Sequence, residues 1–351
     1  MTYIAKPTAR HPGVRPNALG LTPRDYEGAM STLCAGCGHD SVTAALVQAF
    51  YELDVEPHRV AKLSGIGCSS KTPAYFMKEA HGFNSVHGRM PSVAVGANAA
   101  NRGLLYVGIS GDGDSLSIGI GQLCHAIRRN VNILYVLENN GVYGLTKGQF
   151  SASADVGSKS KSGEVNRTEP IDAVNLALSL GATFVARSFS GDKRQLVPIL
   201  KAGMSHEGFA LVDVISPCVT FNNHEESTKS YSYTRSRVHE VVETDFVPLR
   251  REITTDYDEG AVQSVKMHNG STVRFRKVAA HYDPTDRGAV IEYLRASRAK
   301  GEVATGLLYL EESRTDTHAL ENTADRPLVE LPYETLCPGS AALAELQKEW
   351  W

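Results

Sequence analysis

The sequence predicts an α/β protein built on a doubly wound, mainly parallel sheet. Apolar runs typical of buried strands alternate, between about residues 30 and 220, with segments whose apolar residues recur at helical spacing. Glycine-rich turns follow several of the predicted strands, and the chain shows no internal repeat. This alternation favours one sheet with helices on both faces, whose loops gather at the carboxyl ends of the strands.

Two signals locate the individual elements. Helices are assigned where apolar residues lie three or four positions apart, as at Val42, Leu46 and Phe50, and strands where apolar residues follow one another without a break. An acidic glycine turn, GDGD at 111–114, joins one strand to the next helix. The predicted order is helix 39–53, strand 60–66, helix 94–101, strand 104–109, helix 116–127, strand 131–137, helix 171–180, strand 183–187, helix 194–202 and strand 209–215.

Composition shifts along the chain predict its organisation. The polar, Ser- and Gly-rich segment 151–170 is expected to be a mobile loop near a ligand. A hairpin signal at Asn269-Gly270, a helix capped by Asp286 and a strand at 303–310 follow later in the chain. The expected parts are an N-terminal arm (1–20), an α/β domain (21–220) and an irregular C-terminal extension that faces a partner (221–351), for which a true second domain is the alternative.

The overall composition excludes several classes of protein. The chain has 351 residues, of which 42% are hydrophobic and 21% charged, as in an ordinary globular protein. A net charge of -3 without a long basic run argues against a nucleic-acid partner, and no segment reaches the ~18 apolar residues of a membrane span. The first residues show no signal-peptide pattern, and six cysteines do not make a secreted disulfide scaffold here, so we expect a cytoplasmic protein.

The GDGD turn and an Asn-rich loop predict a site for a metal ion and a phosphate group. Asp112 follows one apolar strand and Asn140 follows the next. Because parallel strands end at the same edge of a sheet, these two side chains can meet. Carboxylate, amide and carbonyl oxygens suit Mg²⁺, and the helix N-terminus after Gly113 favours an anion. The alternative interpretation is an ordinary βαβ unit with turn-forming Asp and Asn.

Four of the cysteines lie where a metal centre can form. Cys34 and Cys37 make a C-x-x-C turn before a helix, Cys68 lies in a glycine-rich turn after a strand, and Cys218 follows the last strand of the domain. Four thiolates can hold zinc or a [4Fe-4S] cluster, and their spacing does not decide between the two. C-x-x-C alone is also compatible with a redox dithiol. The cysteines expected to be structural are Cys124 and Cys337.

Together these motifs resemble the β subunit of 2-oxoacid:ferredoxin oxidoreductases, which use thiamine diphosphate. The resemblance rests on CAGCGH, GIGCSS, HGR, GDGD, NN-VYGLTKGQ and SPC, spread over about residues 20 to 225. It implies that Asp112, Asn140 and the carbonyl of Val142 hold Mg²⁺ on the diphosphate, while His39 is interpreted as a helix residue without a role. The cluster ligands that it implies are Cys34, Cys37, Cys68 and Cys218. The other implied cofactor contacts are Ile66, Gly67, Cys68, Ser69, His87, Gly111, Gly113, Asp114, Gly144 and Leu145.

The resemblance also implies a reaction and its partners. Thiamine diphosphate would serve as the electron sink while a 2-oxo acid loses CO₂, the cluster would pass electrons to ferredoxin, and coenzyme A would take the acyl group. In this family the carboxylate that activates the aminopyrimidine ring belongs to the pyrimidine-binding domain of an α subunit. No glutamate of this chain is a candidate for that role, so we expect half of an active site within an (αβ)₂ assembly.

Two residues bear on the substrate. By the resemblance, Lys71 and Leu145 occupy positions where members that accept 2-oxoglutarate have substrate-side residues. A lysine there can pair with the distal carboxylate of 2-oxoglutarate, which pyruvate lacks, although a solvated lysine at a helix start is the alternative. The leading hypothesis is therefore a 2-oxoglutarate:ferredoxin oxidoreductase that forms succinyl-CoA. Its competitors are a pyruvate or broad 2-oxoacid enzyme, a non-redox thiamine-dependent decarboxylase or carboligase subunit, and an iron-sulfur electron-transfer protein.

Overall fold

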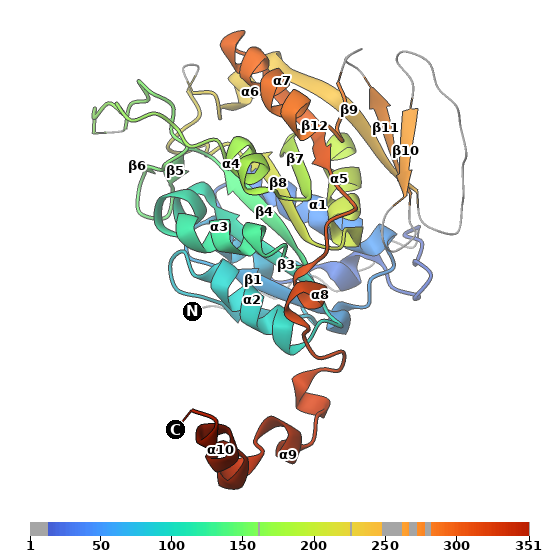
Figure 1. The fold of residues 1–351 in the computed structure, drawn as a ribbon. Coiled ribbons are helices and arrows are strands. Elements are labelled where there is room, and N and C mark those ends of the chain that lie inside the picture. The colour runs from blue at the N-terminus through green and yellow to red at the C-terminus, as the bar shows by residue number, and fades with distance from the viewer. Residues whose placement is uncertain are drawn as a thin grey trace.

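The computed structural model describes residues 13–160, 162–224, 227–247, 262–266, 272–277 and 282–350. Within these residues ten strands form one sheet, in the order β10-β11-β9-β12-β7-β8-β4-β3-β1-β2 (Figure 1). Its strands are β1 (Val60–Ser64), β2 (His81–Asn84), β3 (Leu105–Gly111), β4 (Ile133–Asn139), β7 (Phe184–Phe189), β8 (Phe209–Ile215), β9 (Val238–Val247), β10 (Val262–Lys266), β11 (Thr272–Lys277) and β12 (Val303–Leu310).

The neighbouring strands from β2 to β7 run parallel, which confirms the predicted fold class. β4 lies between β3 and β8 and is buried along its whole length, as expected for a strand covered on both faces. Because these strands share one direction, the loops that follow them lie at one edge of the sheet.

Helices cover both faces of the parallel strands. α1 packs against α5 on one face, and α2, α3, α4 and α7 form a layer on the other (Figure 1). Asp172, Asp192 and Asp286 cap α4, α5 and α7 by accepting backbone N–H bonds, the last as predicted. The described part of the chain has no helix long and apolar enough to cross a membrane. The helices are α1 (Gly38–Glu52), α2 (Met90–Ala100), α3 (Ile120–Arg128), α4 (Ala173–Leu180), α5 (Lys193–Ser205), α6 (Tyr231–Arg237), α7 (Arg287–Ala299), α8 (Thr317–Glu321), α9 (Tyr333–Leu336) and α10 (Gly339–Lys348).

The helix expected at 116–127 differs from the prediction. The chain after Asp112 first forms a π-helical turn, Gly113–Ile118, and α3 begins only at Ile120. Gly119 separates the two and lies so close to the backbone of Gly88 that a Cβ there would approach the Gly88 carbonyl oxygen to 2.6 Å. Turns of this type are rare and often lie at functional sites.

The C-terminal extension is partly built into the main sheet. β12 pairs antiparallel with β7, and α7 packs on β12, so the boundary expected at residue 221 does not coincide with the edge of the sheet. β10 and β11 pair with Val265 opposite Val273, as the hairpin signal predicts, and the turn residues 269–270 lie outside the described residues. Beyond α8 the chain leaves the sheet and carries α9 and α10 away from it (Figure 1).

The described part of the expected N-terminal arm, residues 13–20, lies on the chain's own surface. Asn17 donates hydrogen bonds to the hydroxyl of Tyr26 (2.8 Å) and to the carbonyl of Tyr51 (3.1 Å). Residues 1–12 lie outside the described part.

Candidate functional site

Loops from the carboxyl ends of β1, β3 and β4 enclose a cavity of about 200 Å³ at this edge of the sheet. Its wall contains all the residues that the sequence resemblance assigns to thiamine diphosphate and Mg²⁺. The wall also includes His39 from α1, Tyr143 and Thr146. The rule that parallel strands end together therefore brings the predicted residues to one place.

Asp112 is buried and held by donors from two later segments. Its Oδ2 accepts hydrogen bonds from the N–H of Gly141 (2.9 Å), the hydroxyl of Ser153 (2.6 Å) and the hydroxyl of Ser151. Its Oδ1 accepts a longer bond, 3.4 Å, from the N–H of Asn140. Burial raises the pKa of Asp112 against the effect of these donors, and a divalent cation would restore the carboxylate form. The less engaged Oδ1 thus fits a Mg²⁺ ligand.

Asn140 begins a tight loop, and two neighbours set the orientation of its side-chain amide. Its side-chain oxygen accepts a bond from the N–H of Val142 (3.0 Å), and its side-chain nitrogen lies 3.3 Å from Nε2 of His39. Burial lowers the pKa of His39 to about 4, so the ring is neutral and Nε2 accepts this bond when Nδ1 carries the proton. His39, which the sequence interpretation set aside, is therefore part of the site.

A buried carboxyl group, Glu138, lies next to His39. Nδ1 of His39 is 2.6 Å from Oγ of Ser216 and 3.4 Å from the Glu138 carboxyl group. The hydroxyl of Thr72 lies 3.2 and 3.1 Å from the two carboxyl oxygens. Burial raises the pKa of Glu138 well above its usual range and lowers that of His39, so both shifts favour the neutral forms. Each side chain is therefore held by its own hydrogen bond, His39 to Ser216 and Glu138 to Thr72, rather than by an ion pair between the two.

Asp114 supports the opposite wall of the cavity. Its carboxylate accepts bonds from the N–H of Gly88 (2.9 Å) and from the hydroxyl of Ser110 (2.9 Å), and Nδ1 of His87 lies 3.4 Å away. A Cβ on Gly65 would collide with the same carboxylate, so glycine is required there. Asp114 thus positions the loop that carries His87, whose ring borders the cavity.

The four cysteines predicted as cluster ligands converge beside the cavity. Cys68 borders it directly, and a Cβ on Gly144 would lie 3.4 Å from Sγ of Cys68 and 3.7 Å from Sγ of Cys218. Cys218 and Cys34 act electrostatically on the Cys68 thiol, and Cys218 acts on that of Cys37. Burial raises the pKa of Cys37 to about 12, and bound iron would hold it as the thiolate. The donor set therefore fits a metal cluster.

The grouping of these cysteines differs from a site for one ion. Among the residues that the structure describes, no group of three or more His, Cys, Asp or Glu side chains is placed to hold a single metal ion. A four-iron cluster distributes its cysteines over different iron atoms, so its ligands need not meet at one point. Cys124 lies apart from the group in α3, and Cys337 lies exposed after α9.

The two residues predicted to face the substrate are placed differently. Leu145 borders the cavity and is 48% exposed. Lys71 lies on a short 3-10 helix (Ser69–Ala74) and is not among the residues that border this cavity. Its charge lowers the pKa of the Cys68 thiol, against the larger effect of burial, which raises it. Within this chain, Lys71 therefore acts on the thiol of Cys68 but does not line the cavity.

Three polar residues of the site belong to none of the sequence motifs. Ser151 and Ser153 lie in the segment expected to be a mobile loop, yet both are buried and donate to Asp112. Asn222 donates from its side chain to the carbonyl of Asn140 (2.8 Å). The alternating serines that follow the Asn-rich loop are a weak signal for such a role, because buried hydroxyls need partners.

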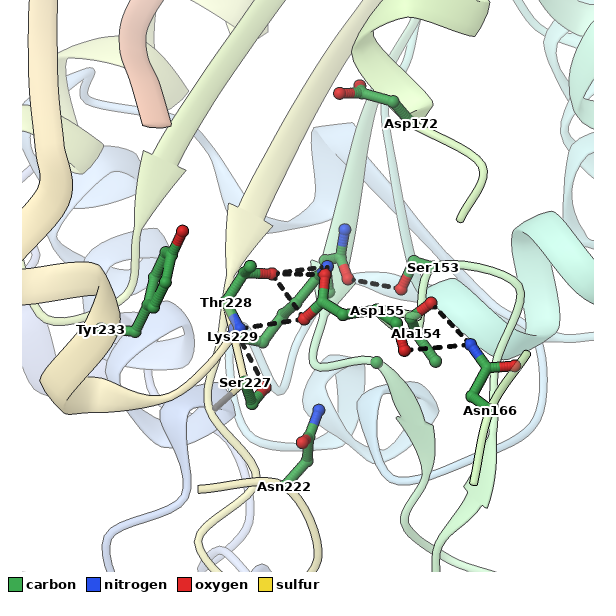
Figure 2. A network of polar contacts seen from close by, with 12 residues as sticks. Ser153, Ala154, Asp155, Asn166, Asp172, Asn222, Ser227, Thr228, Lys229 and Tyr233 are labelled. Carbon is green, nitrogen blue, oxygen red and sulfur yellow. Dashed lines mark hydrogen bonds and ion pairs between the residues drawn. The ribbon is translucent and has the colours of Figure 1, made fainter. Parts of the chain in front are cut away.

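A second cavity, of about 310 Å³, has Ser153 in its wall. Oγ of Ser153 also lies 2.8 Å from the side-chain oxygen of Asn139, and both residues line this second cavity. Figure 2 shows Asp155 bonded to the N–H of Thr228 (2.9 Å) and to Nζ of Lys229 (3.0 Å). Further ion pairs on this wall are Arg187–Asp172 and Arg187–Asp213. The contacts of Asp155 tie the segment after Ser153 to the chain that follows Cys218.

Comparison with known proteins identifies the class of this site. The profile of the thiamine pyrophosphate enzyme C-terminal TPP-binding domain matches residues 65–214. The fold and the cavity thus define a thiamine diphosphate-binding enzyme domain.

Its relatives narrow this class to one family. The 2-oxoacid:ferredoxin oxidoreductase subunit beta of Saccharolobus solfataricus is 43% identical over 199 residues, which span 56% of this chain and 65% of that protein. The 2-oxoglutarate synthase subunit KorB of Methanocaldococcus jannaschii is 35% identical over a stretch that spans 54% of this chain and 69% of that protein. The chain belongs to the family of 2-oxoacid:ferredoxin oxidoreductase β subunits.

Two further relatives bear the name of 2-oxoglutarate. The 2-oxoglutarate oxidoreductase subunit KorB of Mycobacterium tuberculosis is 41% identical over 54% of this chain and 51% of that protein. The structure of the 2-oxoglutarate:ferredoxin oxidoreductase from Magnetococcus marinus, with 2-oxoglutarate, coenzyme A and succinyl-CoA bound, matches 88% of this chain and 92% of its own, with a TM-score of 0.71 and 30% identity. The alignments to the Saccharolobus and Mycobacterium proteins cover less than two thirds of those proteins' lengths.

Proposed function

We propose that the chain is the β subunit of a 2-oxoglutarate:ferredoxin oxidoreductase, which interconverts 2-oxoglutarate and coenzyme A with succinyl-CoA and CO₂ while two electrons are exchanged with ferredoxin. Family membership supports the class of reaction, and the relatives named for 2-oxoglutarate support the substrate. The observation that carries the proposal is the position of Gly144, in the loop of residues 140–148 (the cofactor loop), against Sγ of Cys68 and Cys218. One loop borders both the predicted cofactor and the predicted electron acceptor.

The cavity residues fit thiamine diphosphate with Mg²⁺. When bound, thiamine diphosphate supplies an electron sink for the loss of CO₂ from a 2-oxo acid. Asp112, Asn140 and the carbonyl of Val142 would hold Mg²⁺ against its diphosphate. The π-helical turn begins at Gly113, and the backbone amides of its first turn favour the same anion. Tyr143 keeps this turn in place, since its hydroxyl donates to the Gly113 carbonyl (3.0 Å).

The cysteines would hold a [4Fe-4S] cluster that takes the electrons to ferredoxin. Cys68 belongs to both centres, because it borders the cavity and lies beside Cys218. Cys37 and Cys218 are buried, which keeps water from this side of the cluster. We propose a cytoplasmic location as well, since thiols of this kind persist in a reducing compartment.

The cavity lacks a spare carboxylate to activate the aminopyrimidine ring. The carboxylates on its wall are Asp112 and Asp114, and both already accept several hydrogen bonds. We therefore propose that an α subunit supplies the missing group within an (αβ)₂ assembly. The chain alone is expected to show no oxidative decarboxylation, and full activity of the isolated chain would contradict this.

Metal and cofactor analysis of the purified complex tests the proposal. Anaerobic absorption spectra with iron, sulfide and thiamine diphosphate assays should give about four irons and four sulfides per chain, with bound thiamine diphosphate. Thiamine diphosphate without iron would replace the redox assignment by a decarboxylase or carboligase. Iron without thiamine diphosphate would instead indicate an electron-transfer protein.

The substrate is tested by Lys71→Met, with the exposed Lys78→Met as the matched control. If Lys71 meets the distal carboxylate in the complete enzyme, loss of a charge-assisted contact lowers kcat/KM for 2-oxoglutarate about ten- to a hundredfold, chiefly through KM. Pyruvate turnover and the control should change little. Equal losses on both substrates would place Lys71 at the cluster instead, where its effect on Cys68 already points.

A broad 2-oxoacid specificity is the second candidate function. The Saccharolobus relative is named for 2-oxoacids, and Lys71 does not border the cavity of this chain. Comparable kcat/KM values for pyruvate and 2-oxoglutarate would favour this alternative.

A further inference from the structure

The turn from Cys218 to Asn222 contacts both predicted centres. Asn222 is buried, and its backbone N–H donates to the carbonyl of Cys218 (3.0 Å). Its side-chain amide donates to the carbonyl of Asn140 (2.8 Å). A single residue therefore links a predicted cluster ligand to a predicted Mg²⁺ ligand.

The cofactor loop rests on this turn at both of its ends. A Cβ on Gly141 would lie 2.6 Å from Nδ2 of Asn222, and a Cβ on Gly148 would lie 2.7 Å from the ring of Phe221. Both glycines have positive φ, 78° and 100°, a conformation that other residues adopt at a cost. In Figure 2 the amide of Asn222 points toward the network around Ser153, Asp155 and Lys229. The approach of the loop to the turn is thus close and requires glycine.

We propose that Asn222 is a positioning residue that couples the cysteine centre to the cofactor loop. This inference rests on the proposed function. With Cys218 held by a cluster, the turn would be fixed, and Asn222 would hold the backbone of Asn140, whose side chain is a predicted Mg²⁺ ligand. When Cys218 is not ligated, the turn loses an anchor. Binding of thiamine diphosphate must then order the cofactor loop, and the entropy cost of this ordering weakens the affinity. The coupling is reciprocal, so the bound cofactor also favours cluster retention.

Affinity for thiamine diphosphate, measured by equilibrium dialysis of the purified complex with excess Mg²⁺, tests the coupling. Iron-loaded and chelator-stripped samples are compared for wild type, Asn222→Ala and the similarly shaped Asn222→Asp. The matched control is Thr220→Ala, an exposed side chain of the same turn. Iron content is measured in every sample, so the result does not depend on catalytic activity.

Wild type and Thr220→Ala should bind thiamine diphosphate about tenfold more weakly after iron removal, as expected for one buried hydrogen bond. Both Asn222 variants should retain iron yet show the weaker affinity before stripping, with little further loss afterwards. Equal affinity of loaded and stripped wild type would overturn the coupling, and this comparison holds even if a variant fails to fold. Wild-type affinity in folded Asn222 variants, or parallel loss of iron and cofactor, would also overturn it. A wild-type complex without iron or thiamine diphosphate would refute the proposed function itself.

Discussion

Asp112→Asn is expected to abolish Mg²⁺-dependent binding of thiamine diphosphate while the fold persists. Because Gly141, Ser151 and Ser153 all donate to Oδ2, the amide oxygen of the new side chain takes that position. Its NH₂ group then occupies the position of Oδ1, 3.4 Å from the N–H of Asn140. A donor at this point cannot ligate a cation. Removal of the side chain in an alanine variant would instead leave these buried donors without their acceptor.

Two opposing effects set the change in stability. Three hydrogen bonds to an ionised acceptor become bonds to a neutral one, at a cost of about 1 kcal/mol each. Removal of a buried carboxylate, whose pKa burial raises, offsets part of this cost. The free energy of unfolding should therefore fall by about 1 to 2 kcal/mol. Loss of a metal ligand should weaken cofactor binding more than a hundredfold, beyond the effect of losing a supporting residue.

The assay is the thiamine diphosphate content of the purified complex, with thermal unfolding of the same samples. Asp155→Asn is the matched control, because it weakens charge-assisted bonds to Thr228 and Lys229 but does not border the cofactor cavity. The control should keep wild-type cofactor content at a similarly lowered Tm. Wild-type content in Asp112→Asn would refute the ligand assignment, and equal loss in both variants would show that stability, not ligation, had been measured.

Two further predictions concern stability. The ammonium group of Lys62 donates to three backbone carbonyls at 2.7 to 2.8 Å, and burial lowers its pKa from 10.5 to about 8. Between these pH values the unfolded chain binds more protons than the folded protein. The free energy of unfolding of wild type, measured in urea relative to that of Lys62→Met, should therefore rise by about 3 kcal/mol from pH 8 to 10.5. A difference between the two proteins that is independent of pH would contradict this. Gly119→Ala should lose about 1 to 3 kcal/mol in the same assay, because its Cβ would lie 2.6 Å from the Gly88 carbonyl oxygen. Gly121→Ala, which meets open space, is the control, and equal stability of the two variants would argue against the close approach.

The sequence by itself determined the parallel sheet and most of the cavity wall. Strands β3, β4 and β8 are covered on both faces, so their nearly continuous apolar residues are a local signal that needs no knowledge of the partners. The rule that parallel strands end at one edge then brings Asp112 near Asn140, as the bond between them confirms. The positions of four cysteines at turns and strand ends indicated a metal centre, but only the family resemblance favoured a cluster over zinc, because spacing does not decide between the two.

Only the tertiary structure decided how these residues are supported. His39 and Asn222 both contact Asn140 from distant parts of the chain, and Ser151 and Ser153 turn inward to Asp112. A polar side chain has no periodicity that reveals its partner, since the bond forms only where folding removes both groups from water. The same holds for β12, whose place beside β7 depends on pairing between segments more than a hundred residues apart. Local patterns therefore specify elements and edges, whereas the contacts that orient the predicted ligands arise from packing across the whole chain.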